Sequence, residues 1–361
     1  MLSIKSQGYS VHIGDNSLLQ LGQFIKDHQE YSQYFIIVDE NTLQNCLPIL
    51  LQQIPSLKDA EVIETESGEV NKNIEVVTQV WMAMSEFHAD RKALVINLGG
   101  GVISDMGGFI ASTYKRGIHF LNIATTLLSQ VDASVGGKLG IDLGGLKNQI
   151  GVFNYPQGVF IYPEFLNTLP FEQLRSGFAE VLKHALIKDV DYWQEVKNIE
   201  LKEGSDWQKI IHHSVGIKNK VVMADPTEQG ERKLLNYGHT IGHAIETYHL
   251  ENNELTTLLH GEAIAIGMIA EGYLSLKKTG LLQNELDELV QVMAKFFPLP
   301  VLSKSDFDKY LALMVHDKKN QKGKISFSLL NSIGKSEWDV FCEENDILEA
   351  LIYYNETAEK A

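Results

Sequence analysis

The sequence lacks several features that define whole classes of protein. It has only two cysteines, Cys46 and Cys342, among 361 residues, too few for a disulfide framework or a cysteine-rich zinc site. No apolar run is long enough for a membrane span, because Glu262 and Glu271 interrupt the stretch EAIAIGMIAEGYLSL. The opening MLSIKSQGYSVHIG alternates like a strand and lacks the apolar core of a signal peptide. We therefore expect a cytoplasmic protein without membrane association.

Positive charge is also scarce. Lysine and arginine together number 31 against 47 acidic residues, which gives a formal net charge of −16. Such a charge argues against nucleic acid as a partner. If the ligand is an anionic small molecule, the few cations must be gathered locally. The composition, 44% hydrophobic and 22% charged, is that of a globular protein, and the length allows two domains with real cores.

The first part of the chain has an α/β pattern. Short β-branched runs at 34–40, 93–101 and 119–126 end in turn or glycine residues, and the segment 71–88 between them has helical periodicity. Strands that alternate with helices predict a mostly parallel sheet, which binds ligands at the carboxyl ends of its strands. The segment 158–170 is expected to supply a last strand and a connector.

The pattern changes after this connector. The segments 171–187, 235–249 and 260–278 all have the periodicity of helices. We therefore predict an α/β domain over residues 1–164 and an all-α domain over residues 165–361.

A glycine cluster, NLGGGVISDMGG at 97–108, follows a predicted strand and opens a predicted helix. It matches neither GxGxxG nor a P-loop. It is either a tight turn with close helix–strand packing or a place where backbone N–H groups approach a pyrophosphate. Polar side chains at the ends of neighbouring strands favour a dinucleotide site: Asp39, Glu69, Lys72, Thr125 and Thr126.

Two histidines, His239 and His243, are four residues apart and therefore share one helix face. Thr240 stands where HExxH would have its glutamate, so the metalloprotease motif is absent. With His260 and Glu180 they could form a catalytic zinc site with an open coordination position; two ordinary surface histidines are the alternative. We expect packing or surface roles for His12, His28, His88, His212, His213 and His249.

The scarce cations and their amide neighbours cluster near these segments. A solvated surface lysine is the ordinary alternative for each, although glycine next to a lysine allows close backbone approach to a ligand. The set comprises Lys138, Lys147, Asn148, Lys183, Lys218, Arg232, Asn236, Lys318 and Lys319.

Taken together, these motifs resemble the 3-dehydroquinate synthase family over nearly the whole chain. The motifs that carry the resemblance are GGGVISDMGGFIASTYKRG, ATTLLSQVDASVGGKLGIDLGGLKNQIG, SGFAEVLKHALI, RKLLNYGHTIGHAIE and HGEAIAIGM. The resemblance implies a Rossmann-like domain and a helical domain with the active site between them, NAD, and one divalent metal, usually zinc, with cobalt as another possibility. It implies conversion of the sugar phosphate 3-deoxy-D-arabino-heptulosonate 7-phosphate into 3-dehydroquinate and phosphate, in a cytoplasmic homodimer.

The resemblance also assigns residues. The implied metal ligands are Glu180, His239 and His260, and His243 would lie beside the substrate. Positions that match NAD contacts are Asp39, Asn41, Glu69, Lys72, Gly100, Gly101, Asp105, Thr125, Thr126, Asp132, Lys138, Lys147 and Thr168. Positions that match substrate contacts are Lys138, Asn148, Lys183, Lys218, Arg232, Asn236 and Lys318. Arg116 matches an arginine that reaches the phosphate site of the neighbouring subunit.

Two positions depart from the usual family pattern. Leu139 replaces a threonine and Asp142 replaces an asparagine, in a segment implied to touch cofactor and substrate. A relative that cyclises another sugar phosphate, to a valiolone, an inosose or an aminated dehydroquinate, is therefore an alternative. A metal-dependent polyol dehydrogenase of the glycerol dehydrogenase type would need fewer cations. A non-catalytic binding protein would be free to lose the Glu180 and histidine set.

Overall fold

The computed structural model describes residues 2–144, 146–201, 205–315 and 324–360. The chain forms two compact units by packing: Met1–Leu174 with Glu203–Met223, and Arg175–Lys202 with Ala224–Ala361. These units interleave along the chain. The domain boundary between residues 164 and 165 stays a prediction.

The first unit is built on a seven-stranded sheet. Its strands are β1 (Leu2–Lys5), β2 (Ser10–Ile13), β3 (Gln33–Asp39), β4 (Glu61–Thr65), β5 (Ala93–Gly99), β6 (His119–Ala124) and β9 (Val159–Ile161). Their order is β1-β2-β9-β6-β5-β3-β4, and all neighbours are parallel except β1 and β2. The order reverses between β3 and β5, the kind of position at which such sheets bind ligands. The predicted parallel sheet is confirmed.

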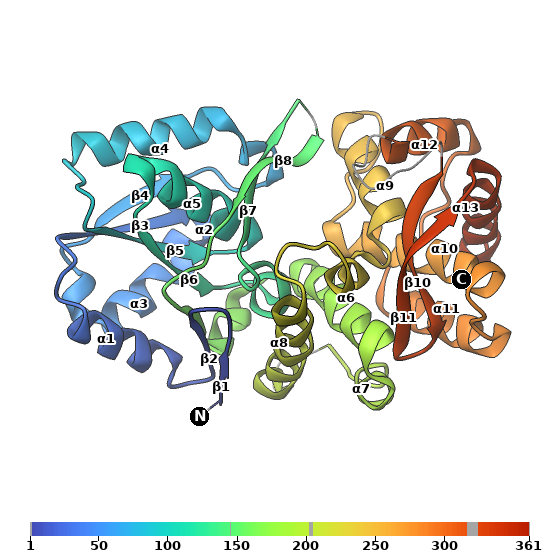
Figure 1. Ribbon diagram of the computed structural model, residues 1–361, viewed down its shortest axis with the longest axis horizontal. Helices are drawn as coiled ribbons and strands as arrows, with labels where there is room; N and C mark the ends of the chain where they lie inside the picture. The colour runs from blue at the N-terminus through green and yellow to red at the C-terminus, as the bar shows by residue number, and fades with distance from the viewer. Residues whose placement is uncertain (1, 145, 202–204, 316–323, 361) are drawn as a thin grey trace. The chain divides into compact units, whose positions relative to one another are not determined.

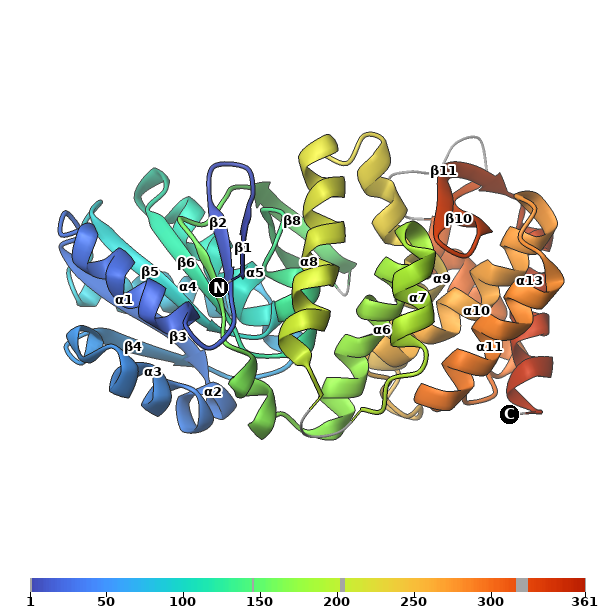
Figure 2. The ribbon, with the colours of Figure 1, turned by 90° about the horizontal axis from the view of Figure 1, so that it is seen from below.

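Helices cover both faces of this sheet because successive strand residues point to opposite sides. Phe35 and Ile37 of β3 join one core with residues of α4 (Ile74–Glu86) and α5 (Gly101–Thr113). Ile36 and Val38 join the other core with α1 (Ser17–Asp27) and α3 (Leu47–Gln53). Figures 1 and 2 show these two layers on either side of the strands. The strands are therefore buried on both faces, as a parallel sheet requires.

An antiparallel hairpin, β7 (Lys138–Leu143) and β8 (Leu146–Phe153), contains the glycine-rich segment of the first unit. Gly140 pairs with Gly151, and a Cβ on Gly151 would lie 2.3 Å from the Leu139 carbonyl oxygen. The glycines therefore let the two backbones approach closely. The remaining elements of this unit are α2 (Glu40–Asn45), α8 (Trp207–Ala224), the π-helix η4 (Ser129–Ala133), and the short 3₁₀ helices η1 (Pro55–Leu57), η2 (Glu69–Asn71), η3 (Tyr114–Arg116) and η5 (Pro163–Thr168).

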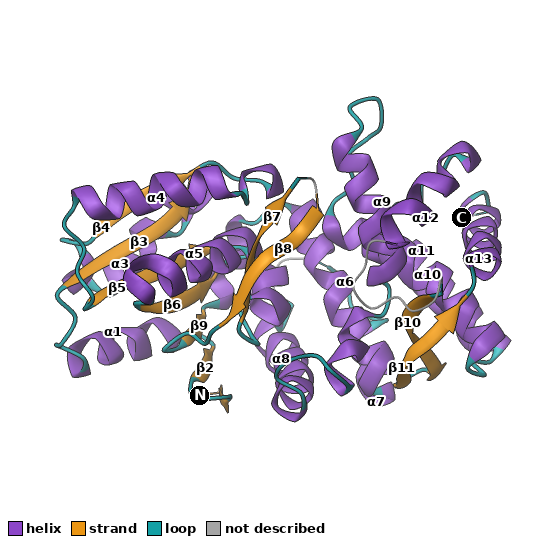
Figure 3. Cartoon of the chain, turned by 45° about the horizontal axis from the view of Figure 1, so that its top comes forward, coloured by secondary structure: helices purple, strands orange, loops and turns teal. Residues whose placement is uncertain are grey.

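The second unit is mainly helical. Its elements, including one helix that begins in the first unit, are α6 (Phe171–Lys188), α7 (Val190–Val196), η6 (Glu231–Asn236), α9 (His239–Glu251), α10 (His260–Lys278), α11 (Gln283–Phe296), η7 (Lys304–Asp306), α12 (Phe307–Val315), β10 (Ile325–Ser332), β11 (Lys335–Cys342) and α13 (Glu344–Ala358). The hairpin β10–β11 is an addition to the predicted all-helical pattern, and Figure 3 shows it as strands among helices. It is joined to α10, since the backbone N–H of Leu330 donates to Ser275 Oγ at 2.9 Å.

The central helix of this unit, α10, is buried over most of its length, and α11 has the amphipathic pattern of a covering helix. Leu286, Leu289, Met293 and Phe296 recur at helical spacing and are buried. Among the residues that the structure describes, no helix is both long and apolar enough to span a membrane.

Candidate functional site

Helix α6 holds Glu180 in a fully buried position. Phe178, Val181 and Ala185 form its apolar face and are fully buried. Glu180 and Lys183 are also buried, at 0% and 1% exposure, and form an ion pair one helical turn apart. Charged side chains of this helix therefore point inward together with its apolar face. A buried carboxylate of this kind requires positive charge nearby.

His239 is the first residue of α9 and points its Nε2 atom at Glu180. The ring Nδ1–H donates to the carbonyl oxygen of Tyr237 at 3.0 Å. Because a carbonyl oxygen can only accept, the proton of the neutral ring must be on Nδ1, and Nε2 carries an available lone pair. Nε2 lies 3.4 Å from Glu180 Oε1. Burial, followed by the charge of Lys183, lowers the pKa of His239 to about 3. The ring is therefore neutral at physiological pH, which is the form that binds metals.

His260 is the first residue of α10 and approaches the same carboxylate. Its Nε2 lies 3.7 Å from Glu180 Oε1, and its Nδ1 lies 3.3 Å from Glu246 Oε2. Burial lowers the pKa of His260, but Glu246 and Glu180 outweigh burial and raise it to about 9. Metal-binding imidazoles usually have one nitrogen hydrogen-bonded to a carboxylate and the other directed at the metal. His260 has this arrangement, with Nδ1 near Glu246 and Nε2 near Glu180.

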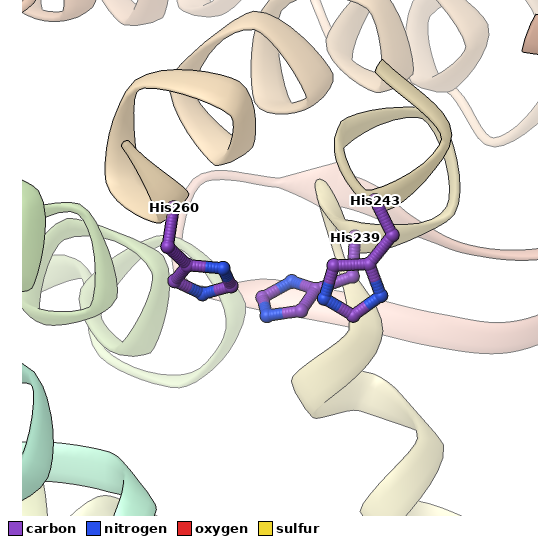
Figure 4. A group of neighbouring side chains, drawn as sticks. All are labelled: His239, His243 and His260. Carbon is purple, nitrogen blue, oxygen red and sulfur yellow. The ribbon is translucent and has the colours of Figure 1, made fainter. Parts of the chain in front are cut away.

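His243 completes a trio of imidazoles, and Figure 4 shows its ring beside those of His239 and His260. The ring centroids of His239 and His243 are 4.9 Å apart, and those of His243 and His260 are 5.8 Å apart. One nitrogen from each of the three rings lies within 4.8 Å of the others. The structure thus brings His239, His243, His260 and Glu180 together, the four residues named above as a possible zinc site.

Two glutamates that the sequence analysis did not single out support this site. Glu246 of α9 contacts His260. Glu271 of α10 is fully buried and accepts the backbone N–H groups of Gly238 and Ile241 at 2.6 and 3.1 Å. The only sequence signal for Glu271 is that it interrupts an apolar helix.

In the first unit, several residues predicted to contact NAD form one ion-pair cluster. Lys72 Nζ donates to Asp105 Oδ2 and to Asn148 Oδ1, both at 2.8 Å, and Glu69 lies 3.7 Å from Lys72 and 3.6 Å from Lys147. Burial lowers the pKa of Lys72, but Asp105 and Glu69 outweigh it, so the net shift is upward. Burial raises the pKa of Asp105.

The glycine cluster lies where β5 meets α5. Gly100 is the N-cap of α5, and this helix start has no side-chain cap. A Cβ on Gly100 would lie 3.1 Å from Thr126 Cγ2, so the turn is closely packed. Gly107 packs on Asn97 of the sheet, where a Cβ would meet Oδ1 at 2.0 Å. Both interpretations of the cluster therefore have support, since close packing coexists with an open helix N-terminus that favours anions.

The other residues predicted to bind NAD lie at strand ends or in short helices. Asp39 ends β3 and caps α2 by accepting the Thr42 N–H at 2.8 Å. Asn41 lies in α2, Thr125 is buried just after β6, and Thr168 ends η5. This dispersal follows from the parallel sheet, which collects the carboxyl ends of strands from distant parts of the chain.

The predicted substrate residues are held in different ways. Lys218 of α8 contacts Asp132 of η4, with its Nζ 2.9 Å from Asp132 Oδ1. In η6, Arg232 is buried and donates to the Pro226 carbonyl at 2.7 Å, and Asn236 donates to Glu228 Oε1 at 2.7 Å. Lys138 is exposed at the start of β7. Lys318 and Lys319 lie outside the described residues.

Arg116 lies on a strained turn of the first unit. Lys115, Arg116 and Gly117 have φ values of 48°, 73° and 106°, and a positive φ costs a non-glycine residue roughly 1 kcal/mol or more. Arg116 lines a surface pocket of about 470 Å³ together with Asp90, Arg91, Lys92 and Lys115. Strain of this kind is often retained where a side chain must be presented.

The two departures from the family pattern have structural roles. Leu139 is 7% exposed and belongs to the core beneath α5; a Cβ on Gly108 would lie 2.4 Å from its Cδ2. Asp142 accepts the Asn148 N–H at 2.7 Å within the hairpin. The Leu139 side chain therefore packs in the interior, and the Asp142 carboxylate holds the backbone N–H of Asn148.

Two family models match consecutive parts of the chain. Residues 62–176 match the 3-dehydroquinate synthase N-terminal family model and residues 177–320 match the C-terminal one. The 3-dehydroquinate synthase of Parabacteroides distasonis is 41% identical over 330 residues, which are 91% of this chain and 93% of that protein.

Two solved structures share the fold. A 2-deoxy-scyllo-inosose synthase complexed with carbaglucose-6-phosphate, NAD⁺ and Co²⁺ has a TM-score of 0.84 at 23% identity, over 98% of this chain and 99% of that one. The 2-epi-5-epi-valiolone synthase of Streptomyces hygroscopicus subsp. jinggangensis 5008, with NAD⁺ and Zn²⁺ bound, has a TM-score of 0.80 at 26% identity, over 100% and 99%. These matches confirm the predicted fold class. With the two family models and the relative at 41% identity, they establish that this chain belongs to the 3-dehydroquinate synthase family.

Proposed function

We propose that this chain is a phosphate-eliminating carbon–oxygen lyase, a 3-dehydroquinate synthase that converts 3-deoxy-D-arabino-heptulosonate 7-phosphate into 3-dehydroquinate and phosphate. This is the second step of the shikimate pathway to chorismate. The observation that carries the proposal is the buried Glu180 carboxylate, which faces the Nε2 atoms of His239 and His260 at 3.4 and 3.7 Å, in a chain of this family.

The donor set of Glu180, His239 and His260 fits a divalent metal. Ligands about 2.0–2.1 Å from a tetrahedral zinc are about 3.3 Å from one another, close to the two separations given above. Three protein ligands leave one position open, as in catalytic sites. The Glu180 carboxylate supplies negative charge that offsets the cation, and the family resemblance places His243 beside the substrate. Zinc is the expected metal, with cobalt as an alternative.

We place NAD on the first unit, at the carboxyl ends of the parallel strands. Support comes from the strand-order reversal between β3 and β5, from the uncapped start of α5 and from the NAD⁺ held by the valiolone synthase. When bound, the metal would make a substrate hydroxyl more acidic, and NAD would serve as both hydride acceptor and hydride donor, so that no net oxidation would result.

The chain's own residues would bind and orient the substrate. Oxidation of one hydroxyl to a ketone acidifies the neighbouring C–H, and loss of that proton allows phosphate to leave; the substrate's own phosphate can accept the proton. After re-reduction, ring opening and an intramolecular aldol step close the carbocycle. One flexible anionic substrate must be held through all these steps, which requires many fixed contacts from lysine, arginine and amide side chains. We assign them to Lys138, Asn148, Lys183, Lys218, Arg232, Asn236 and Lys318.

The function is tested by phosphate release. Purified protein given 3-deoxy-D-arabino-heptulosonate 7-phosphate and NAD should release phosphate while absorbance at the NADH wavelength stays flat, because the hydride is returned. A chelator should abolish the release. Accumulating NADH would instead support a polyol dehydrogenase. No turnover by the metal-loaded protein would favour another sugar phosphate or a non-catalytic role.

We also propose a cytoplasmic homodimer in which Arg116 serves the partner subunit. Its strained turn and the cationic pocket around it support this role. Arg116→Ala should lower activity in the homodimer, yet mixing it with His243→Ala should restore part of the activity, since a mixed dimer then has one complete site. Absence of rescue in verified heterodimers would place Arg116 within its own chain's site or outside the reaction.

A further inference from the structure

We propose that Glu246 and Glu271 form a reciprocal clasp between α9 and α10 that positions the two histidine ligands of the metal. This inference rests on the proposed function, because it treats His239 and His260 as ligands. Each helix begins with one of these histidines and carries, further along, the glutamate that holds the start of the other helix. We call this arrangement the glutamate clasp.

Glu271 of α10 fixes the start of α9. Its Oε2 accepts the Gly238 N–H at 2.6 Å and its Oε1 accepts the Ile241 N–H at 3.1 Å. No side chain at the N-cap satisfies these groups, since the N-cap is Gly238. A helix N-terminus has unsatisfied N–H groups and partial positive charge, so a carboxylate bound there is stabilised. His239 lies between the two residues that this carboxylate binds, and its backbone is therefore fixed.

Glu246 of α9 acts in the opposite direction. Its Oε2 lies 3.3 Å from Nδ1 of His260, the first residue of α10, and its side chain is 8% exposed. The carboxylate accepts the Nδ1 proton and so keeps Nε2 turned toward Glu180. Outer carboxylates of this type set the tautomer and ring orientation of metal-binding histidines.

Packing alone does not call for these buried carboxylates. The helices already meet through glycines: a Cβ on Gly267 would lie 1.9 Å from the Gly238 carbonyl oxygen, and one on Gly242 would lie 2.9 Å from that of Ala263. Burying a carboxylate opposes folding unless its hydrogen bonds compensate, and apolar residues of similar size often serve stability as well or better. Each glutamate contacts the start of the helix that begins with a histidine ligand, and this placement points to a role in positioning the ligands.

Cobalt titration of metal-free protein tests the clasp. We expect the wild-type chain to bind one Co²⁺ with a visible absorption band typical of a low-coordinate N/O site. Glu271→Gln should weaken Co²⁺ binding about 10–100-fold and alter the band, because its amide N–H₂ faces one of two backbone donors. Glu246→Ala should weaken binding similarly. Glu246→Gln should restore it, because the amide oxygen still accepts the Nδ1 proton of His260.

Glu285→Gln provides the matched control. The Glu285 carboxylate accepts the N–H groups of Leu282 and Ile333 at 3.1 and 3.0 Å, at the start of α11. Its variant should lose thermal stability in the metal-free state and bind Co²⁺ like the wild type. Equal Co²⁺ affinities for wild type and Glu271→Gln would overturn the clasp. If that variant does not fold, equal affinities for Glu246→Ala and wild type would overturn it. A wild-type chain that binds no Co²⁺ would overturn the metal site itself, and with it the proposed function.

Discussion

His239→Ala is expected to lose the divalent metal and to lower kcat/KM by about 10³-fold or more. The substitution removes the Nε2 atom that lies 3.4 Å from Glu180 Oε1, which leaves one imidazole and one carboxylate for the cation. Loss of a single electrostatic stabiliser in a buried site reduces kcat by roughly 10²–10³-fold, and loss of a metal removes a larger stabilising charge. Elemental analysis of the purified variant measures the metal, and phosphate release measures activity.

The matched control is His243→Ala, which makes the same change one helical turn along α9. Its ring lies 4.9 Å from that of His239, so both variants open a similar space in the same helix. If Glu180, His239 and His260 are the ligands, His243→Ala should keep its metal and lose activity through substrate contacts. Metal loss in His243→Ala with retention in His239→Ala would move the ligand set toward the other imidazoles.

The sequence predicts the part of this site that depends on local spacing. The four-residue interval between His239 and His243 places both rings on one face of a helix, and α9 is observed over His239–Glu251. The glycine cluster after a β-branched run likewise predicts the junction of β5 and α5. In both cases neighbours along the chain determine the geometry.

Contacts between segments that are distant along the chain could not be predicted from the sequence. The hairpins β7–β8 and β10–β11 depend on partner strands, and glycines within β7 and β8 weaken the strand pattern. Leu139 stands in a segment implied to touch ligands, yet its side chain packs against α5 in the core. In the sequence, Glu271 only interrupts an apolar helix. Its role as an acceptor for the start of α9 is visible only in the folded structure.

Gly267→Ala is expected to lower the free energy of unfolding by about 3 kcal/mol, the upper part of the usual range for overpacking. A Cβ at this position would lie 1.9 Å from the Gly238 carbonyl oxygen and 2.9 Å from the Gly242 backbone nitrogen. Both obstructing atoms belong to the backbone, so no side-chain rotation relieves the overlap. Helix α9 must therefore move away from α10. Urea unfolding of the metal-free protein measures the change.

The same displacement should weaken metal binding, because Gly238 precedes His239 and donates to Glu271 from the other helix. Gly216→Ala is the control: Gly216 lies within α8, and a Cβ there meets nothing within 4 Å. Alanine should stabilise that helix by roughly 0.5–1 kcal/mol and leave Co²⁺ affinity unchanged. If Gly267→Ala were as stable as the wild type and bound Co²⁺ equally well, the close approach of α9 and α10 would not be what holds His239 and His260 in register.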